Sequence, residues 1–181
     1  MRRRNGMVLA LALTLTAGIA VLAQAPAGLP QPGAENKKLA AFVGAWKDEA
    51  EMKAGPFGPG GKMSMTETCD WFTNGFSVVC HTDTTGFMGD IKTLTLLNYN
   101  TGEKIYTFYE LNSFGHTNLA KATLDGDTWT LNSEENMGGK VIRTRTTLKL
   151  PTADTAVMMT DLSVDGGAWT PFMELKGTRV K

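Results

Sequence analysis

The sequence predicts an all-β protein: an up-and-down antiparallel β-barrel of about ten strands, with a short helix before the first strand. Two observations support this prediction. Turn residues recur roughly every 11 to 14 positions, and the segments between them are rich in Thr, Val, Ile, Tyr and Phe without a helical period. Almost every connection is short, which favours a meander, and closure of a meander into a barrel removes its exposed sheet edges. The turn signals are Asn74-Gly75, Met88-Gly89, Thr101-Gly102, Phe114-Gly115, Gly126, Gly138-Gly139, Ala153-Asp154 and Gly166-Gly167.

The first 25 residues have the layout of a secretory signal peptide. Three arginines, at positions 2–4, precede an apolar run from Met7 to Leu22, and Ala23-Gln24-Ala25 fits a cleavage site. A retained membrane anchor is the alternative interpretation. Cleavage would leave 156 residues with a net charge of −3. We therefore expect an exported protein, periplasmic or extracellular.

Residues 26–35 are rich in Pro and Gly and are predicted to form a flexible linker, and residues 36–181 a single barrel domain. Asn36 is expected to cap a short helix from Lys37 to Val43, which Gly44 ends. The first two strands are placed at residues 46–53 and 62–72. The Pro- and Gly-rich loop between them is expected to act as a lid, with Phe57 over the barrel opening.

Cys69 and Cys80 are the two cysteines, and a disulfide between them is expected in an exported protein. Asn-Gly at positions 74–75 is a strong signal for a two-residue hairpin turn. A turn at this point places Cys69 directly opposite Cys80, at a separation that a disulfide can bridge. A redox or metal pair is the alternative, but the sequence has no Cys-x-x-Cys and only His81 nearby.

The short helix leading into Gly44-Ala45-Trp46 resembles the entrance of lipocalin-like (calycin) barrels. In those barrels the tryptophan closes one end under a basic side chain from the last strand. The resemblance therefore implies structural roles for Gly44 and Trp46, with Arg179, or else Lys176, over the ring.

The chain from residue 37 to 181 is also similar to a family of bacterial secreted barrels of unknown function in that superfamily. A second glycine that is common after the entrance tryptophan is absent, so the resemblance implies an architecture and no particular ligand. The segments that carry the similarity are Leu97-Asn98-Tyr99-Asn100, Lys104-Ile105-Tyr106, Asn112-Ser113-Phe114-Gly115, Asp125-Gly126-Asp127-Thr128-Trp129-Thr130, Arg143-x-Arg145 and Ser163-Val164-Asp165-Gly166-Gly167-Ala168-Trp169.

Aromatic and methionine side chains are the candidate walls of a ligand cavity, since a barrel of eight or more strands leaves room for a small molecule. Trp129 and Trp169 each follow an Asp-Gly turn, and we expect them either to line a ligand or to plug the barrel ends. The eight methionines after the leader suit an adaptable cavity or an irregular core. The residues predicted to line a ligand are Trp46, Trp71, Tyr106, Phe108, Trp129, Met158 and Trp169.

The two histidines, His81 and His116, are the candidates for an acid–base role or for the axial ligand of a haem. A zinc site would need three or four ligands at suitable spacing, and the sequence shows none. No catalytic residue is assigned from the sequence.

Glu134 and Glu135 are adjacent and so point to opposite faces of a strand. One of them is expected inside the barrel, where Glu110 or Asp161 would raise its pKa and create a general acid. A solvated strand edge is the alternative.

The sequence favours a non-enzymatic barrel that binds a small apolar or amphipathic molecule. It predicts no nucleic-acid partner, because the net charge is zero, and no membrane association after signal cleavage. The alternatives are an enzyme with an inward acid–base group such as Glu110, Asp161 or His116, a haem-binding barrel, and a filled barrel used for protein contacts.

Overall fold

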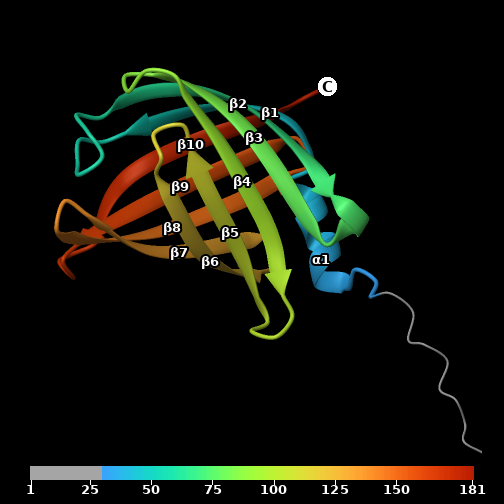
Figure 1. The fold of residues 1–181 in the computed structure, drawn as a ribbon. Helices are drawn as coiled ribbons and strands as arrows, with labels where there is room; N and C mark the ends of the chain where they lie inside the picture. The colour runs from blue at the N-terminus through green and yellow to red at the C-terminus, as the bar shows by residue number, and fades with distance from the viewer. Residues whose placement is uncertain (1–29) are drawn as a thin grey trace, which may run out of the picture. The chain divides into compact units, whose positions relative to one another are not determined.

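The computed structural model describes residues 30–181, which form a closed antiparallel barrel of ten strands (Figure 1). Each strand pairs with its neighbours in sequence, and β1 pairs with β10 to close the barrel. The predicted up-and-down barrel is therefore confirmed. The strands are β1 Gly44–Met52, β2 Gly61–Phe72, β3 Ser77–Gly86, β4 Ile91–Asn100, β5 Ile105–Asn112, β6 Thr117–Asp125, β7 Thr128–Met137, β8 Lys140–Thr152, β9 Thr155–Val164 and β10 Thr170–Val180.

All eight turn signals lie in the connections between strands. In the β2–β3 connection, Asn74 and Gly75 have φ values of 63° and 74°, the left-handed conformation that an Asn-Gly hairpin turn requires. The ladder then pairs Cys69 with Cys80, whose Cα atoms are 4.0 Å apart and whose sulfurs are bonded. The predicted disulfide is confirmed.

The N-terminal helix begins earlier than predicted. Helix α1 spans Ala34–Lys38 and continues into a 3-10 turn, Leu39–Ala41. Gly33 is the N-cap, because its carbonyl accepts the first helical bond from the Lys37 N–H and its own N–H donates to Asn36 Oδ1 at 3.0 Å. Asn36 does not cap the helix, since its Nδ2 donates instead to the Phe76 carbonyl and ties the helix to the β2–β3 connection.

The predicted signal peptide and residues 26–29 of the predicted linker lie outside the described residues. Residues 30–33 of the predicted linker precede α1, and the linker's last two residues, Ala34 and Glu35, belong to the helix. Within residues 30–181, no helix combines the length and the apolar character that a membrane-spanning helix needs.

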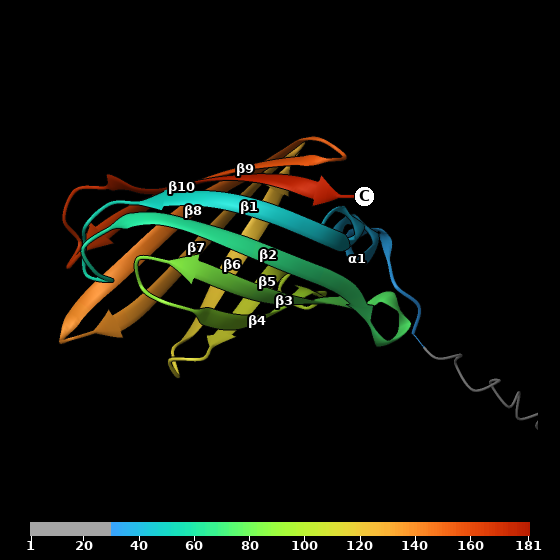
Figure 2. The same cartoon turned by 90° about the horizontal axis from the view of Figure 1, so that it is seen from above.

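Helix α1 lies at one end of the barrel (Figure 2). An apolar cluster of side chains, called the plug below, fills this end. Phe42, just after the 3-10 turn, packs edge-on against Trp129 and Phe108, with ring centroids 5.1 and 5.5 Å apart. Tyr106 packs against Trp129 at 4.7 Å, and its hydroxyl donates to Glu35 of the helix at 2.6 Å. An aromatic side chain typically buries about 150–250 Å² of surface, so these contacts hold α1 over this end of the barrel.

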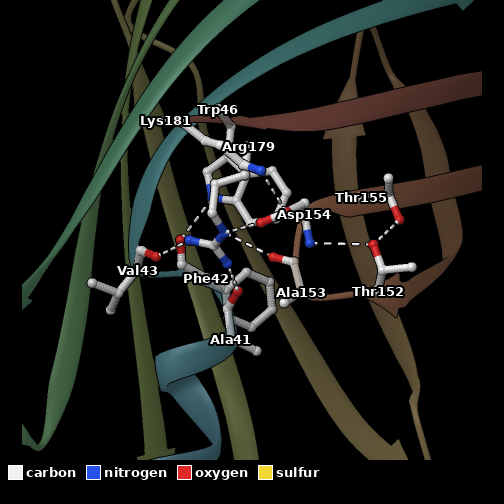
Figure 3. A network of polar contacts seen from close by, with 10 residues as sticks. All are labelled: Ala41, Phe42, Val43, Trp46, Thr152, Ala153, Asp154, Thr155, Arg179 and Lys181. Carbon is white, nitrogen blue, oxygen red and sulfur yellow. Dashed lines mark hydrogen bonds and ion pairs between the residues drawn. The ribbon is translucent and has the colours of Figure 1, made fainter.

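Arg179 of β10 joins the last strand to the start of the first (Figure 3). Its guanidinium carbon lies 4.1 Å from the centre of the Trp46 ring. Its nitrogens donate to the carbonyls of Ala41 at 3.0 Å, of Ala153 at 2.8 Å and of Val43. Gly44, with φ of 127°, leaves room for the guanidinium, because a Cβ there would overlap Nη1. Arg179, and not Lys176, is therefore the basic partner of the tryptophan.

Replacing Arg179 tests how much this clamp stabilises the barrel. Arg179→Lys keeps the charge but loses the planar fork that bonds three carbonyls, so we expect the free energy of unfolding to fall by about 1 to 3 kcal/mol. Urea unfolding followed by tryptophan fluorescence measures the change. Lys176→Ala, at an exposed position of the same strand, is the control and should change it by less than about 0.5 kcal/mol. Equal stability of Arg179→Lys and wild type would show that the clamp is dispensable.

Candidate functional site

The barrel lumen contains a cavity of about 710 Å³. It lies between the plug under α1 and the connections at the opposite end, which contribute Pro56, Phe57, Met88 and Phe114 to its lining. Most of the lining is apolar. Seven of the eight methionines after the predicted leader border it; the exception, Met159, is 54% exposed on the outer surface. The seven are Met52, Met63, Met65, Met88, Met137, Met158 and Met173.

Three of the seven residues predicted to line a ligand border this cavity: Trp46, Phe108 and Met158. Tyr106 and Trp129 do not, because both belong to the plug, where they are 3% and 2% exposed.

Trp71 and Trp169 also lie outside the cavity. Trp71 is next to the end of β2 and borders a hollow shared with the exposed Phe72 and Leu96. Trp169 lies in the β9–β10 connection, not in a strand, and packs under the Arg145 guanidinium at 4.8 Å.

The loop between β1 and β2 contributes to the far end of the lumen. Phe57 borders the cavity and packs against Phe172 of β10, with ring centroids 5.4 Å apart. The loop fold requires a glycine at position 60, where φ is 79° and a Cβ would lie 2.5 Å from the Ala54 nitrogen. Phe57 therefore lies at the end of the lumen away from α1, where the sequence predicts a lid residue.

Four carboxylic acids also border the cavity: Asp48 of β1, Glu67 of β2, Glu110 of β5 and Glu135 of β7. The described lining residues include neither lysine nor arginine. The lumen is therefore lined partly by apolar side chains and partly by carboxylic acids from several strands.

Burial and mutual repulsion raise the pKa values of three of these acids. Burial raises the pKa of Asp48 to about 7, and the neighbouring Glu67 adds to the shift. Burial likewise raises the pKa of Glu67, which the hydrogen bond from Thr82 Oγ1, 2.8 Å, opposes and Glu110 reinforces. The pKa of Glu110 is raised by burial, while His116 counteracts and Glu135 adds to the effect. The acids thus form one electrostatic chain across the lumen.

His116 is the histidine that faces the lumen, whereas His81 is exposed on the outer surface. The Nε2 atom of His116 forms a short contact with Glu135 Oε2. A haem would need an axial histidine on an apolar wall, but His116 stands beside Glu110 and Glu135 and its Nε2 is already bonded. The contact with His116 instead gives Glu135 a basic partner.

Glu134 and Asp161 point away from the lumen. Glu134 bonds the Arg143 Nε at 2.6 Å, and Asp161 bonds the Arg145 Nη2 at 2.8 Å, both on the outer face of the barrel. The prediction that Glu134 and Glu135 point to opposite faces of the strand is confirmed. Asp161 does not face inward, because the β8–β9 register pairs it with the outward Arg145.

Glu67, Cys69 and Cys80 form the one cluster in the described part of the chain whose ligand atoms lie close enough for a metal ion. Both sulfurs belong to the disulfide, so neither is available as a thiolate ligand. The cluster is therefore unsuited to a metal.

Two acceptor groups in the lumen lack donors. The carboxyl of Asp48 is 9% exposed and makes no hydrogen bond or ion pair with the residues that the structure describes. Gly177 of β10 makes room for it, since a Cβ there would overlap Oδ1. Asn118 Oδ1 is also buried and without a partner among residues 30–181. A buried polar atom without a partner, such as Asn118 Oδ1, is rare in folded proteins.

Asp48, Glu67 and Asn118 were not among the residues singled out from the sequence. The sequence signal that points to Asp48 and Glu67 is the alternation of inward and outward residues along β1 and β2. Asp48 shares the inward face with Trp46, and Glu67 shares it with Cys69.

The raised pKa values predict that the barrel loses stability as the pH rises. The pKa of Asp48 is 3.8 in an unfolded chain and about 7 in the folded protein. Between these values the folded state binds more protons, so the free energy of unfolding falls with rising pH. In urea unfolding, Asp48→Asn should reduce the difference between the free energies of unfolding at pH 5 and pH 8 by about 2 kcal/mol. Glu51→Gln, at an exposed position of β1, should leave it unchanged. A wild-type protein equally stable at both pH values would contradict the prediction.

Comparison with known proteins supports the fold and identifies the family. No curated protein matches the chain. The crystal structure of Rv2717c from M. tuberculosis is similar, with a TM-score of 0.60 over 83% of this chain and 100% of that one. The sequence identity is 9%, so the similarity concerns the fold alone. The family model described as "Protein of unknown function (DUF1579)" matches residues 31–179, and the chain therefore belongs to this family.

Proposed function

We propose that the protein is an exported barrel that binds a small amphipathic molecule in its lumen. The observation that supports this function is the cavity of about 710 Å³, which falls within the range of small-molecule sites, about 300 to 1,000 Å³. Cores of folded proteins are packed nearly as densely as organic crystals, so an apolar space of this size is unusual unless something fills it.

The composition of the walls supports an amphipathic ligand. Unbranched, polarisable methionines adapt to ligands of varied shape, and seven of them border the cavity. Phe57 and Phe172 cover the apolar part at the end away from α1. Polar groups lie at a limited number of lining positions, which is the pattern that orients a mostly apolar ligand.

Export is the second part of the proposal. The leader-like residues 1–25 would be removed, leaving a short linker that ends where α1 begins, followed by the barrel domain. The Cys69–Cys80 disulfide supports this proposal, since structural disulfides persist in oxidising compartments.

General acid–base catalysis is a second candidate function of the same cavity. Asp48, with a pKa of about 7, is suited to donating or accepting a proton near neutral pH. Native mass spectrometry of the freshly purified protein would identify a co-purifying molecule. Incubation of that molecule with the protein, followed by NMR, separates the two functions, because only catalysis changes its covalent structure.

A pair of adjacent methionines tests the proposed binding site. Met158 borders the cavity, whereas Met159 points outward, so Met158→Trp fills the lumen and Met159→Trp does not. With N-phenylnaphthylamine as a fluorescent apolar probe, we expect Met158→Trp to weaken binding at least about tenfold, or 1.4 kcal/mol. Met159→Trp should bind as wild type does. Absence of probe binding by wild type, or equal binding by the two variants, would contradict a site in the lumen.

A further inference from the structure

We propose that the molecule bound in the lumen carries a protonated amine, which the carboxylates of Asp48, Glu67 and Glu110 attract to mid-barrel while its apolar part lies against the methionines. This inference rests on the proposed function and specifies the ligand class. Four features of the lumen support it: the position of the acids, the Asp48 carboxyl that lacks a donor, the absence of lysine and arginine from the described lining and the arrangement of the carboxylates.

The acids lie between two apolar regions. Along β1, Asp48 stands between Trp46 and Ala50, and along β5, Glu110 follows Phe108. The plug under α1 forms one apolar end of the lumen, and the cluster around Met52, Met63 and Phe172 forms the other. A ligand with its polar group at mid-barrel and its apolar chain along the wall matches this division.

The carboxyl of Asp48 has no hydrogen-bond donor among the described residues. Asp48 is more than nine-tenths buried and, within the described part of the chain, has no donor, and the same holds for Asn118 Oδ1, opposite Glu110 in the β5–β6 ladder. Thr82 donates its hydroxyl proton to Glu67. An ammonium group supplies three N–H donors and no acceptor, so it would provide the donor that the Asp48 carboxyl lacks.

The charge of the lumen selects a cation. His116 pairs with Glu135 and also lies near Glu110, but Asp48 and Glu67 face no basic residue among the described lining residues. A buried carboxylate without a counter-charge is costly, so a cation that enters the lumen gains the attraction of all three acids. An anionic head group would meet like charge on this wall.

The geometry favours an organic cation over a metal ion. In the described chain, no three acid oxygens from this set converge within the distances of a metal site; the one close cluster consists of Glu67 and the disulfide sulfurs. An ammonium on an alkyl chain suits this lumen, because the ammonium would lie among the carboxylates and the alkyl chain along the apolar lining.

Three probes with the same alkyl chain test the head group: dodecylamine, dodecanol and dodecanoate, titrated calorimetrically into the full barrel below their micelle concentrations at pH 8. We expect dodecylamine to bind at least about tenfold more tightly than either of the others. If dodecanol or dodecanoate binds as tightly, the amine proposal is overturned while the proposed function stands. If none of the three binds, the proposed function fails as well.

Variants that remove one charge at nearly constant shape locate the amine. We expect Asp48→Asn and Glu67→Gln each to weaken dodecylamine binding about tenfold or more and to leave dodecanol binding unchanged, which also shows that each variant is folded with an open lumen. Glu51→Gln removes an exposed charge from the same strand as Asp48 and is the matched control. Unchanged amine binding in the two lumen variants, or an equal loss in Glu51→Gln, would overturn the proposal.

Discussion

The pairing of β1 with β10 is the contact on which the rest of the structure depends. Eight residue pairs, from Ala45–Val180 to Met52–Met173, join the two strands and remove both edges of the sheet. Pairing strands this far apart in sequence carries an entropic cost, so contacts that reinforce the closure matter. Arg179 supplies such contacts, because it bonds carbonyls before β1 and after β8 from its position on β10.

Closure with ten strands also explains why the lumen is not filled by side chains. The diameter of a barrel grows with the number of strands, and about eight strands already leave an interior that side chains just fill. Here the helix and its aromatic plug close one end, and Phe57, Phe172 and the methionines crowd the other. The middle is left with threonines and acids, which do not fill the width of the barrel.

The sequence predicted the features that are encoded locally. Turn residues placed every connection, and one Asn-Gly turn set the register that pairs Cys69 with Cys80. The aromatic residues were harder to place, because the same amphipathic side chain packs into a plug, a cavity wall or an outer surface. Trp129 and Trp169 follow similar Asp-Gly turns, yet one begins a strand at the plugged end and the other lies in a connection. Their difference depends on where each strand starts relative to the lumen, which is a property of the closed barrel.

The buried acids show what the fold tolerates at its centre. The raised pKa values of Asp48, Glu67 and Glu110 favour the neutral carboxyl, and Asp48, with a pKa of about 7, is partly protonated near neutral pH. On the proposed function, an ammonium competes with those protons for the same oxygens, and its binding releases them. Replacing the acids with apolar residues would avoid the cost of burying charge, as it often does for buried ion pairs in other proteins. These carboxyls border a cavity, and Asp48 has no partner among the described residues. Because burying them costs stability, a role in binding a ligand explains their presence better than a role in packing the core.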